Sequence, residues 1–533
     1  MARRTGGRGW FGLTAGRAAA ALLAGALPCL AFPAPSLWWL AYAALVPWLL
    51  LVRTAPTSRR AACEGWLGGL GYMLAVHHWL LPSLNVFTVV LAALLGVLWA
   101  PWGVLVRQLL GGVPPPGRAV AALVVLPAGW LLIELARSWQ GLGGPWGLLG
   151  SSQWQVAPAL RLASVGGVWL VSLLVVAVNV AAVLLISAGP PRVSAVVALV
   201  LVAVAAGAVW QWAPRPQPTG QARIAVVQPG VVAGPHSTAR RLALEEQLTR
   251  RLARQDVDLV VWGESGVSAD PSRRPELAAR LARLSAAVGA ELLVNVDARQ
   301  APLTGEPGGR AVFKRAVLVD GRGLTGARYD KMRLVPFGEY VPARSLLGWA
   351  TSVGRAAGED RGRGTRQVLM DAGHGLRVGP LICFESAFPD MGRQLAADGA
   401  GVLVVQSSTS SFQHSWAPEQ HASLAALRAA ETGRPVVHAT LTGVSAVFGP
   451  GGERTGPVLG TGSRAAAVYS VPLASGTTPY VRFGDWAVHG SLLVLALFFT
   501  VRGVRSFNRP ALAPLPPEPL ARTVRGWPGR RGH

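Results

Sequence analysis

Three reactive side chains in the second half of the chain lie at or near the ends of short apolar segments. Cys383 comes directly after apolar residues 378–382, Glu264 follows a similar run at 259–262, and Lys331 lies between the two in the sequence. A strand that ends in a turn exposes the next side chain at the edge of a sheet. A carboxylate can take the proton of a thiol, the thiolate can attack a carbonyl carbon, and an ammonium group can stabilise the oxyanion. These residue types therefore fit nucleophilic catalysis at a carbonyl group.

The cysteine and the lysine differ in how much they indicate on their own. A single cysteine in an apolar strand is usually a small buried hydrophobic side chain. Lys331 is more informative, because only Lys314 and Lys331 among the 50 basic residues are lysines. Arginine fills every other basic position, so a lysine here indicates a need for a compact point charge. Together with the carboxylate, this lysine favours the catalytic interpretation of Cys383.

The order Glu264, Lys331, Cys383 resembles the nitrilase superfamily of carbon–nitrogen hydrolases. Residues 329–342 are similar to a membrane branch of that superfamily, the apolipoprotein N-acyltransferases, and so is the Gly- and Trp-containing segment 144–153. The resemblance implies that Cys383 is the nucleophile and Glu264 its general base. It implies that Lys331 stabilises the oxyanion.

Supporting roles follow from the same resemblance. The backbone N–H of Phe384 would complete the oxyanion hole with Lys331. Glu339 and Glu385 match family carboxylates that orient the catalytic groups. The residues expected to contact the substrate are Trp146, Gln153 and Phe412.

The implied reaction is an acyl transfer in two steps. A membrane phospholipid, the acyl donor, would acylate Cys383 to a thioester. The thioester would then pass its acyl chain to the N-terminal α-amine of the S-diacylglyceryl cysteine of a prolipoprotein, which is the acceptor. Neither step needs a metal ion, a nucleotide or another cofactor, so we expect none.

Several positions depart from the family pattern. Gly263 stands where a proline usually precedes the base, and Phe384 replaces a usual tyrosine. Residues 407–412 and 440–443 differ from the segments that line the family's site. These changes leave two alternatives open, a membrane-tethered amidase that passes its acyl group to water and a non-catalytic paralogue that binds lipid or lipoprotein. Retention of all three catalytic residue types argues against the paralogue.

The composition divides the 533-residue chain into membrane and soluble parts. Hydrophobic residues make up 51% and charged residues 14%, and the apolar excess lies in 18–213 and near 486–502. About 20 apolar residues span a bilayer. The predicted spans are 18–34, 36–52, 62–81, 85–110, 119–136, 162–187, 193–212 and 486–502. The predicted organisation is a seven-helix bundle at 1–213, a linker at 214–221, a catalytic domain at 222–475, a helix at 486–502 and an Arg-rich cytoplasmic tail at 503–533.

The short loops between the spans indicate the orientation. Arginines gather in alternate loops, whereas the turns near Pro33 and Pro82 carry no charge, and Arg-rich loops face the cytoplasm. These arginines are Arg3, Arg4, Arg8, Arg17, Arg53, Arg59, Arg60, Arg107, Arg118 and Arg192. Arg137 and Arg161 are exceptions. The pattern places the catalytic domain on the extracytoplasmic face of the cytoplasmic (inner) membrane of a bacterium.

The formal net charge of +24 raises the question of nucleic-acid binding. Much of that charge lies in the loops and tail predicted to be cytoplasmic, where it follows from topology and from anionic lipid headgroups. No zinc-ligand set or base-stacking module accompanies it in the sequence, so a nucleic-acid partner is excluded.

Strand-like and helix-like segments alternate in the predicted catalytic domain, which indicates an α/β domain. The expected helices are 237–255, 275–288, 389–397 and 418–431, and the expected strands are 223–228, 259–262, 291–296, 311–319, 401–406 and two within 436–448. The family resemblance sharpens this to a four-layer α-β-β-α sandwich carried by a polytopic bundle of about eight transmembrane helices. Residues 354–366, rich in glycine and arginine, are expected to form a mobile exposed loop near which lipids enter.

Overall fold

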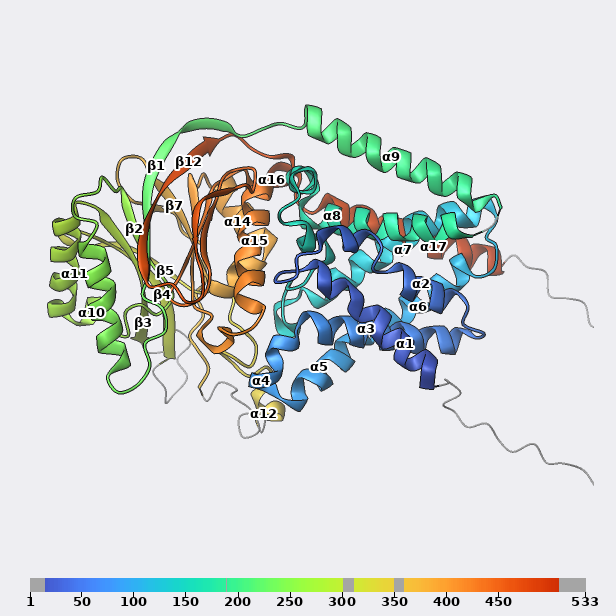
Figure 1. Ribbon diagram of the computed structural model, residues 1–533, viewed down its shortest axis with the longest axis horizontal. Helices are drawn as coiled ribbons and strands as arrows, with labels where there is room; N and C mark the ends of the chain where they lie inside the picture. The colour runs from blue at the N-terminus through green and yellow to red at the C-terminus, as the bar shows by residue number, and fades with distance from the viewer. Residues whose placement is uncertain (1–14, 188, 301–310, 349–358, 508–533) are drawn as a thin grey trace, which may run out of the picture.

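A helical bundle and a two-sheet domain lie side by side in the computed structural model, which describes residues 15–187, 189–300, 311–348 and 359–507. The sheets occupy the left of Figure 1 and the bundle occupies the right. The chain crosses from the bundle into the first strand and returns to it after the last strand. The two parts are therefore joined by two covalent connections as well as by packing.

The bundle contains most of the helices. They are α1 (Ala15–Ala26), α2 (Val46–Arg53), α3 (Ser58–Val76), α4 (Leu81–Leu84), α5 (Val86–Gly96), α6 (Trp99–Leu110), α7 (Pro116–Arg137), α8 (Ala157–Ile186), α9 (Pro191–Trp212) and α17 (Trp486–Phe507). Four described helices, α7, α8, α9 and α17, are long and apolar enough to cross a membrane. The number rises to five if α5 and α6, which bend by 43° at their junction, form one span.

The eight predicted spans therefore appear only in part as long apolar helices. The stretch predicted as one span at 85–110 is the bent pair α5 and α6. The stretch predicted at 18–34 breaks after Ala26, where the short turn Leu27–Ala31 contains Pro28, a residue that interrupts helical hydrogen bonding. In α3 the charged side chains lower the hydropathy of an otherwise apolar helix.

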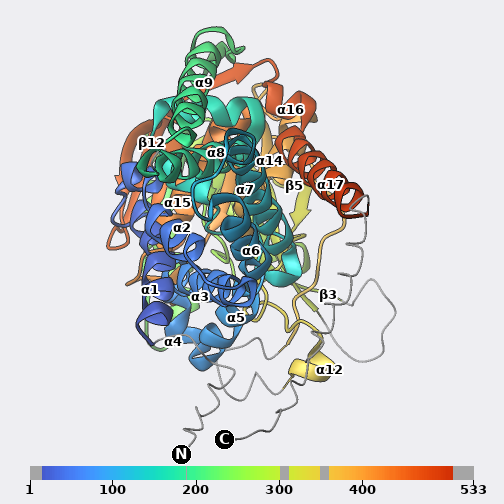
Figure 2. The same cartoon turned by 90° about the vertical axis from the view of Figure 1, so that its right-hand side faces the viewer.

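Tryptophan rings and glycines pack the centre of the bundle. The ring centroids of Trp48 and Trp102 lie 5.3 Å apart, and those of Trp99 and Trp130 lie 5.4 Å apart. A Cβ atom on Gly68 of α3 would lie 2.0 Å from the Trp48 ring, so the glycine makes room for it. Figure 2 shows α9 and α17 at the periphery of the bundle, where both expose large hydrophobic side chains. Those faces are suited to lipid contact.

The second part contains two six-stranded sheets packed face to face. Their strand orders are β12-β1-β2-β3-β4-β5 and β11-β10-β9-β8-β7-β6. The first sheet comprises β1 (Gln217–Gln228), β2 (Leu259–Trp262), β3 (Glu291–Gln300), β4 (Ala311–Asp320), β5 (Gly323–Asp330) and β12 (Ala465–Ser475). The second comprises β6 (Met370–Asp371), β7 (Arg377–Ile382), β8 (Val402–Ser407), β9 (Val436–Thr440), β10 (Ser445–Phe448) and β11 (Arg454–Leu459).

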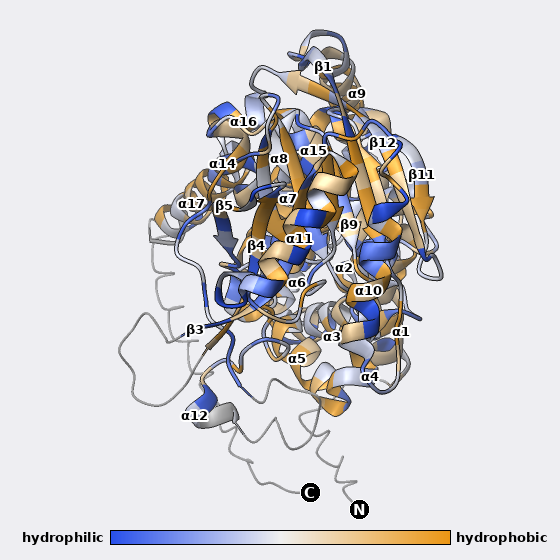
Figure 3. Ribbon diagram, turned by 90° about the vertical axis from the view of Figure 1, so that its left-hand side faces the viewer, coloured by the Kyte–Doolittle hydropathy of each residue, from blue (hydrophilic) through white to orange (hydrophobic). Residues whose placement is uncertain are grey.

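Helices cover the outer faces of both sheets. They are α10 (Ser237–Arg250) and α11 (Pro275–Val288) on the first sheet, and α14 (Pro389–Ala397) and α15 (Ala417–Thr432) on the second, with α12 (Arg344–Leu347) and α16 (Pro479–Phe483) in the connections. Apolar side chains from both sheets, such as Ile224 and Val378, fill the space between them. Figure 3 shows hydrophobic strands behind α10 and α11, which carry hydrophilic residues. The arrangement is the expected four-layer α-β-β-α sandwich.

α15 differs from the other covering helices because it is buried all round. Every residue from Ala417 to Thr432 except Glu419 is buried. One side of α15 packs on the second sheet and the other packs on the bundle, where Leu427 and Ala430 join its core. Its polar side chains must therefore find partners inside the protein.

Several predicted boundaries change. β1 begins at Gln217, inside the predicted linker 214–221, because its early residues pair with β12, a strand that the sequence did not indicate. Of the predicted mobile loop 354–366, residues 354–358 lie outside the described residues. The described remainder is held in place, since the backbone N–H of Gly362 donates to Val312 and that of Gly364 donates to Lys331. The tail beyond Phe507 and the first 14 residues also lie outside the described residues.

Candidate active site

The three predicted catalytic residues, Glu264, Lys331 and Cys383, follow the carboxyl ends of β2, β5 and β7. β7 is parallel to β8, and β8 is parallel to β9, so their ends lie together. Cys383 follows β7 directly and has φ +52°, a left-handed conformation that is rare for residues other than glycine. Such a turn costs free energy and lifts the side chain clear of the sheet.

Glu385 holds this turn against the segment that carries Lys331. Its Oε2 accepts from the backbone N–H of Ile382 at 2.8 Å. Its Oε1 accepts from the Tyr329 hydroxyl and the Met332 N–H, both at 2.7 Å, and from the Arg333 N–H at 3.1 Å. Because the carboxylate is fully buried, these four bonds replace its hydration. Glu385 thus fixes Cys383 relative to Lys331.

Lys331 lies at the centre of a buried charge cluster. Its Nζ is 3.1 Å from Glu264 Oε1 and 2.9 Å from Glu339 Oε1. The second oxygen of Glu339 accepts from the Val335 N–H at 2.8 Å, which keeps the carboxylate oriented. Burial alone would lower the pKa of Lys331, but the two carboxylates raise that pKa well above its usual value. Lys331 is therefore a permanent cation.

Cys383 is a protonated thiol in the resting site. Burial raises its pKa to about 12, and the charges of Glu264 and Glu339 raise it as well, while Lys331 and a hydrogen bond with Ser407 lower it. A thiol with this pKa cannot attack a carbonyl without losing its proton first. The site therefore needs a base. Glu264 and Glu339 both contact Lys331, and of the two Glu264 has the larger electrostatic effect on Cys383.

An apolar cavity of about 260 Å³ opens beside Cys383. Phe384 and Phe412 of the sheet domain line it, and so does Trp146, which lies between α7 and α8 of the bundle. Helices α4 and α5 of the bundle line the other side, with Leu84, Leu91, Ala92, Leu94 and Leu95 among the contributing residues. The Nε1 atoms of Trp79 and Trp146 both donate to Gln420 on α15, at 3.1 and 2.9 Å. Thus the cavity exists only where the bundle and the sheet domain meet.

Gln153, the third residue expected to contact the substrate, does not line this cavity. It is buried, and its Nε2 donates to the Trp38 carbonyl and to Ser152 Oγ, both at 2.9 Å. The structure gives Gln153 a packing role within the bundle, so we do not retain it as a substrate contact.

His421 belongs to the site, although the sequence did not indicate it as a site residue, and it contacts Ser407, the first residue of the altered segment 407–412. His421 Nε2 lies 3.0 Å from the Cys383 carbonyl, and its Nδ1 lies 3.1 Å from Ser407 Oγ. The carbonyl can only accept, so Nε2 carries the proton and Nδ1 accepts from Ser407. Burial lowers the pKa of His421 to about 4, so the ring is neutral. Sequence offered only a histidine in a predicted helix, without the burial that gives it these partners.

The departures from the family pattern lie against one another. The Ser407 carbonyl accepts from the N–H groups of Glu264, at 3.1 Å, and Leu441, at 2.8 Å. A Cβ atom on Gly263 would lie 1.9 Å from the backbone nitrogen of Leu441. The Thr409 N–H donates to the Thr442 carbonyl at 2.9 Å. The altered segments therefore form one interlocked support beneath Glu264.

No metal centre is formed by the described part of the chain, since no group of three or more His, Cys, Asp or Glu side chains there could hold a metal ion. The chemistry available to the site is that of a carboxylate, an ammonium group and a thiol.

Comparison with protein families divides the chain at the same place as the structure does. Residues 24–181 match the apolipoprotein N-acyltransferase N-terminal domain, and residues 223–475 match the carbon-nitrogen hydrolase family. Together the two matches cover most of the bundle and the sheet domain from residue 223 onward. Only the first six residues of β1 lie outside the second match.

Two relatives that align with this chain over nearly their full length are both apolipoprotein N-acyltransferases. An apolipoprotein N-acyltransferase of Geobacter metallireducens is 30% identical over 91% of this chain and 95% of its own. One of Azotobacter vinelandii is 32% identical over 89% of this chain and 93% of its own. Among solved structures, an amidase from Nesterenkonia sp. AN1 is 21% identical, covers 52% of this chain and 98% of its own, and superposes with a TM-score of 0.35.

Proposed function

Because the chain belongs to the apolipoprotein N-acyltransferase family, we propose that Glu264, Lys331 and Cys383 carry out its acyl transfer. The enzyme's function is the N-acylation of apolipoproteins, and it is a multi-pass membrane protein. In this proposal the donor is a membrane phospholipid and the acceptor is the N-terminal α-amine of an S-diacylglyceryl cysteine.

One observation carries the assignment of the donor. The cysteine of the sheet domain faces a cavity whose opposite wall is made of leucines from the membrane helices. A water-soluble amide would gain nothing from that wall, whereas an acyl chain buries its methylenes against it. A cavity shared between a nucleophile and a membrane bundle therefore supports a lipid ester as the substrate.

The first half-reaction forms the thioester. Glu264 takes the proton of Cys383, and the thiolate attacks the ester carbonyl carbon of the phospholipid. Lys331 and the backbone N–H of Phe384 stabilise the oxyanion. The carbon–oxygen bond then breaks, and the lysophospholipid leaves as an alcohol with the proton held by Glu264.

The second half-reaction transfers the acyl chain to nitrogen. The acceptor amine attacks the thioester carbonyl while Glu264 takes a proton from the amine. The carbon–sulfur bond breaks, the amide forms, and the proton returns to the Cys383 sulfur. His421 and Ser407 act as positioning residues in both steps, since they contact the nucleophile's carbonyl and thiol.

Incubation of the purified enzyme with phospholipid alone tests this mechanism. We expect one acyl chain on Cys383, seen by intact-protein mass spectrometry and removed by hydroxylamine, because the first half-reaction needs no amine. Cys383→Ala should abolish loading, while Cys29→Ala and Cys63→Ala are the matched controls. Glu264→Gln and Lys331→Ala should each slow loading by about a hundredfold or more.

A diacylglyceryl lipopeptide should then discharge the thioester onto its α-amine. Loading followed by release of free fatty acid, without transfer to the lipopeptide, would indicate the amidase. A folded protein that binds lipid but forms no thioester would indicate the non-catalytic paralogue. The interlocked support beneath Glu264 argues against the non-catalytic paralogue, because the altered segments preserve the position of the base.

The complete topology is also proposed. We infer that the shorter apolar helices within 15–31 and 38–53, together with α3, bring the number of spans to eight. The charge of Glu64 in α3 is neutralised inside the bundle, since Arg17 Nε lies 2.7 Å from it. The linker from α9 is reduced to residues 213–216, and the catalytic domain extends from Gln217 to Ser475.

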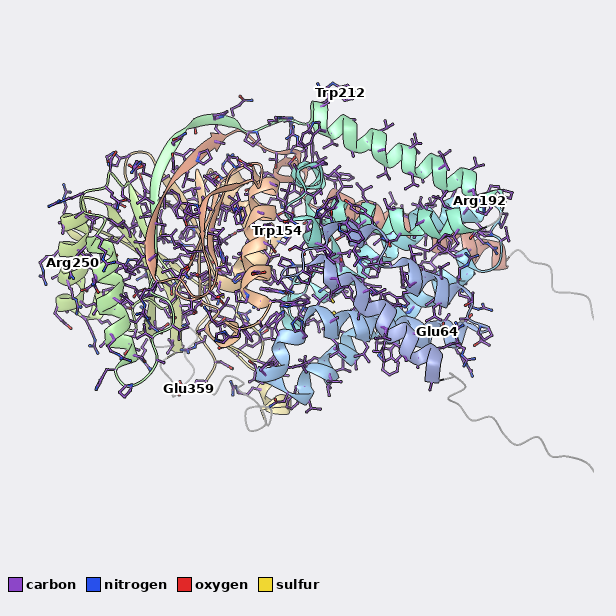
Figure 4. All side chains as sticks on the ribbon, in the orientation of Figure 1. Glu64, Trp154, Arg192, Trp212, Arg250 and Glu359 are labelled. Carbon is purple, nitrogen blue, oxygen red and sulfur yellow. The ribbon has the colours of Figure 1, made fainter. Side chains whose placement is uncertain are left out.

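We propose that the catalytic domain lies on the extracytoplasmic face. Figure 4 supports this, because Arg192, one of the arginines on the predicted cytoplasmic side, lies at the end of the bundle far from the sheets. The two exceptional arginines have local structural partners. Arg137 donates to the Trp146 and Gly147 carbonyls at 2.7 and 2.5 Å, and Arg161 donates to the Pro214 carbonyl at 3.0 Å. Their positions therefore reflect packing rather than orientation.

A further inference from the structure

A second cavity lies where the bundle meets the sheet domain, separate from the active site. Its volume is about 750 Å³, within the range of ligand sites, and none of the catalytic residues lines it. Its walls are the start of α8, the end of α9, the linker before β1, and the turn between β10 and β11. We call it the junction cavity.

The junction cavity is electropositive. Its charged lining residues are Arg161, Arg215, Arg454 and Glu453. Arg161 donates to the carbonyls of Ala213 and Pro214, and Arg215 donates to the Trp210 carbonyl at 3.3 Å. Neither Arg161 nor Arg215 has an ion pair with any described carboxylate. Two guanidinium groups thus face one cavity with only neutral partners.

Two buried donors in the same lining also lack acceptors. Arg161 Nε and Trp154 Nε1 are buried and have no hydrogen-bond partner in the part of the chain that the structure describes. Both groups can donate but not accept. A ligand rich in acceptor oxygens and negatively charged would satisfy both the charge and the missing hydrogen bonds.

The position of the cavity indicates where such a ligand comes from. Figure 4 labels Trp154 at the junction of the two parts and Trp212 at the end of α9. Trp210 is 44% exposed there, and tryptophans at the ends of spans mark the level of lipid headgroups. Below that level α9 exposes apolar side chains such as Val200 and Val204, which suit acyl chains.

We propose that the junction cavity binds the phosphate headgroup of an anionic phospholipid whose acyl chains lie along α9. The bound lipid contacts α8, the linker and the β10–β11 turn at once, so it stabilises the contact between the bundle and the catalytic domain. This site is distinct from the donor site at Cys383 and takes no part in the transfer of the acyl chain.

Native mass spectrometry of the full-length enzyme tests the proposal. The probes are ether-linked phosphatidylglycerol, which is anionic and cannot be consumed as a donor, and ether-linked phosphatidylcholine, which is zwitterionic. Wild type should retain one phosphatidylglycerol in preference to phosphatidylcholine. In Arg161→Gln/Arg215→Gln that affinity should fall about tenfold or more, the scale for losing charge-assisted hydrogen bonds.

Matched variants separate this result from a folding defect. Arg322→Gln/Arg328→Gln removes two exposed arginines of the sheet domain and should bind phosphatidylglycerol as wild type does. Arg161→Lys/Arg215→Lys keeps the charge and should restore most of the preference. Equal retention of the two lipids by wild type, or undiminished phosphatidylglycerol binding by the glutamine variant, would overturn the proposal.

Thioester loading is measured on the same preparations, so that the lipid site and the acyl-transfer mechanism are tested independently. Loading should persist in Arg161→Gln/Arg215→Gln, because the variant leaves Cys383 and its partners in place. If wild type fails to load a thioester, the catalytic assignment fails while the lipid-retention result still decides the junction cavity.

Discussion

At the level of single residues, the site works by keeping opposite charges together and away from water. Lys331 bridges Glu264 and Glu339. This arrangement leaves Cys383 protonated, because burial and the nearby carboxylates outweigh the lysine at the sulfur. A protonated thiol resists oxidation and stray alkylation until a substrate brings a carbonyl group into reach.

The resting state of the thiol has a measurable pH dependence. Because the pKa of Cys383 is about 12, the rate of its alkylation by iodoacetamide should rise throughout pH 7 to 10, about tenfold per unit, without a plateau. An unstructured cysteine-containing peptide, the control, has a thiol pKa of about 8.5, so its rate should level off above about pH 9.5. Peptide mass spectrometry of Cys383 gives the rate. A plateau for Cys383 below pH 9 would show that the resting site holds a thiolate.

At the level of elements, the sequence predicted those helices and strands whose positions depend on local sequence signals. The helices at 275–288 and 389–397 and the strand at 259–262 have the predicted bounds, because their apolar spacing and their proline starts are local signals. β12 could not be predicted in this way. It exists because it pairs with β1, and pairing partners far apart in sequence leave no local mark.

The residues of the candidate site also fall into those that local motifs indicate and those that depend on tertiary packing. Glu264, Lys331 and Cys383 were predicted from residue type and motif, and in the structure Glu264 contacts Lys331 while the charges of both act on Cys383. His421 was missed, because its role depends on α15 being buried between a sheet and a bundle. Gln153 was misassigned as a substrate contact, because a motif cannot tell a lining residue from a packed one.

Gly263 gives a test at this level. A Cβ atom there would meet the backbone of Thr440 and Leu441 at 2.5 and 1.9 Å, and backbone cannot move aside without shifting β9. Gly263→Ala should therefore lower the free energy of unfolding by about 3 kcal/mol or more. Gly462→Ala, where an added Cβ meets nothing within 4 Å, should change it by less than about 0.5 kcal/mol.

Thermal unfolding of the two variants in the same detergent makes the comparison. If Gly263→Ala is as stable as Gly462→Ala, residue 263 does not pack tightly against the backbone of Thr440 and Leu441. The altered segments would then not support Glu264 in the way proposed here.

At the level of the whole molecule, α15 joins the two parts. Gly166 and Gly167 interrupt α8, and the N–H of Val168, freed from the helix, donates to Glu431 of α15 at 2.8 Å. Arg428 pairs with the same carboxylate at 2.8 Å and donates to the Ala387 carbonyl. These buried contacts hold the catalytic edge at a fixed distance from the bundle.

The proposed orientation of the whole molecule can be checked by labelling in intact cells. In a Cys29→Ala/Cys63→Ala background, a membrane-impermeant maleimide should reach a cysteine at Gly462 but not one at Gly117. Both sites are exposed and have no atom within 4 Å of an added Cβ, so access rather than packing decides the result. The background without an introduced cysteine is the control, and the reverse pattern would place the catalytic domain in the cytoplasm.

The two-sided wall of the active-site cavity bears on the design of inhibitors. An electrophile that reaches only Cys383 meets a set of groups that soluble members of the nitrilase superfamily are expected to share, so it would not discriminate among them. Leu91, Leu94 and Leu95 come from the bundle, which an isolated sheet domain lacks. A compound whose tail lies against those leucines would owe its selectivity to the membrane helices. Screening against the excised domain would discard such compounds, since half of their binding surface would be missing.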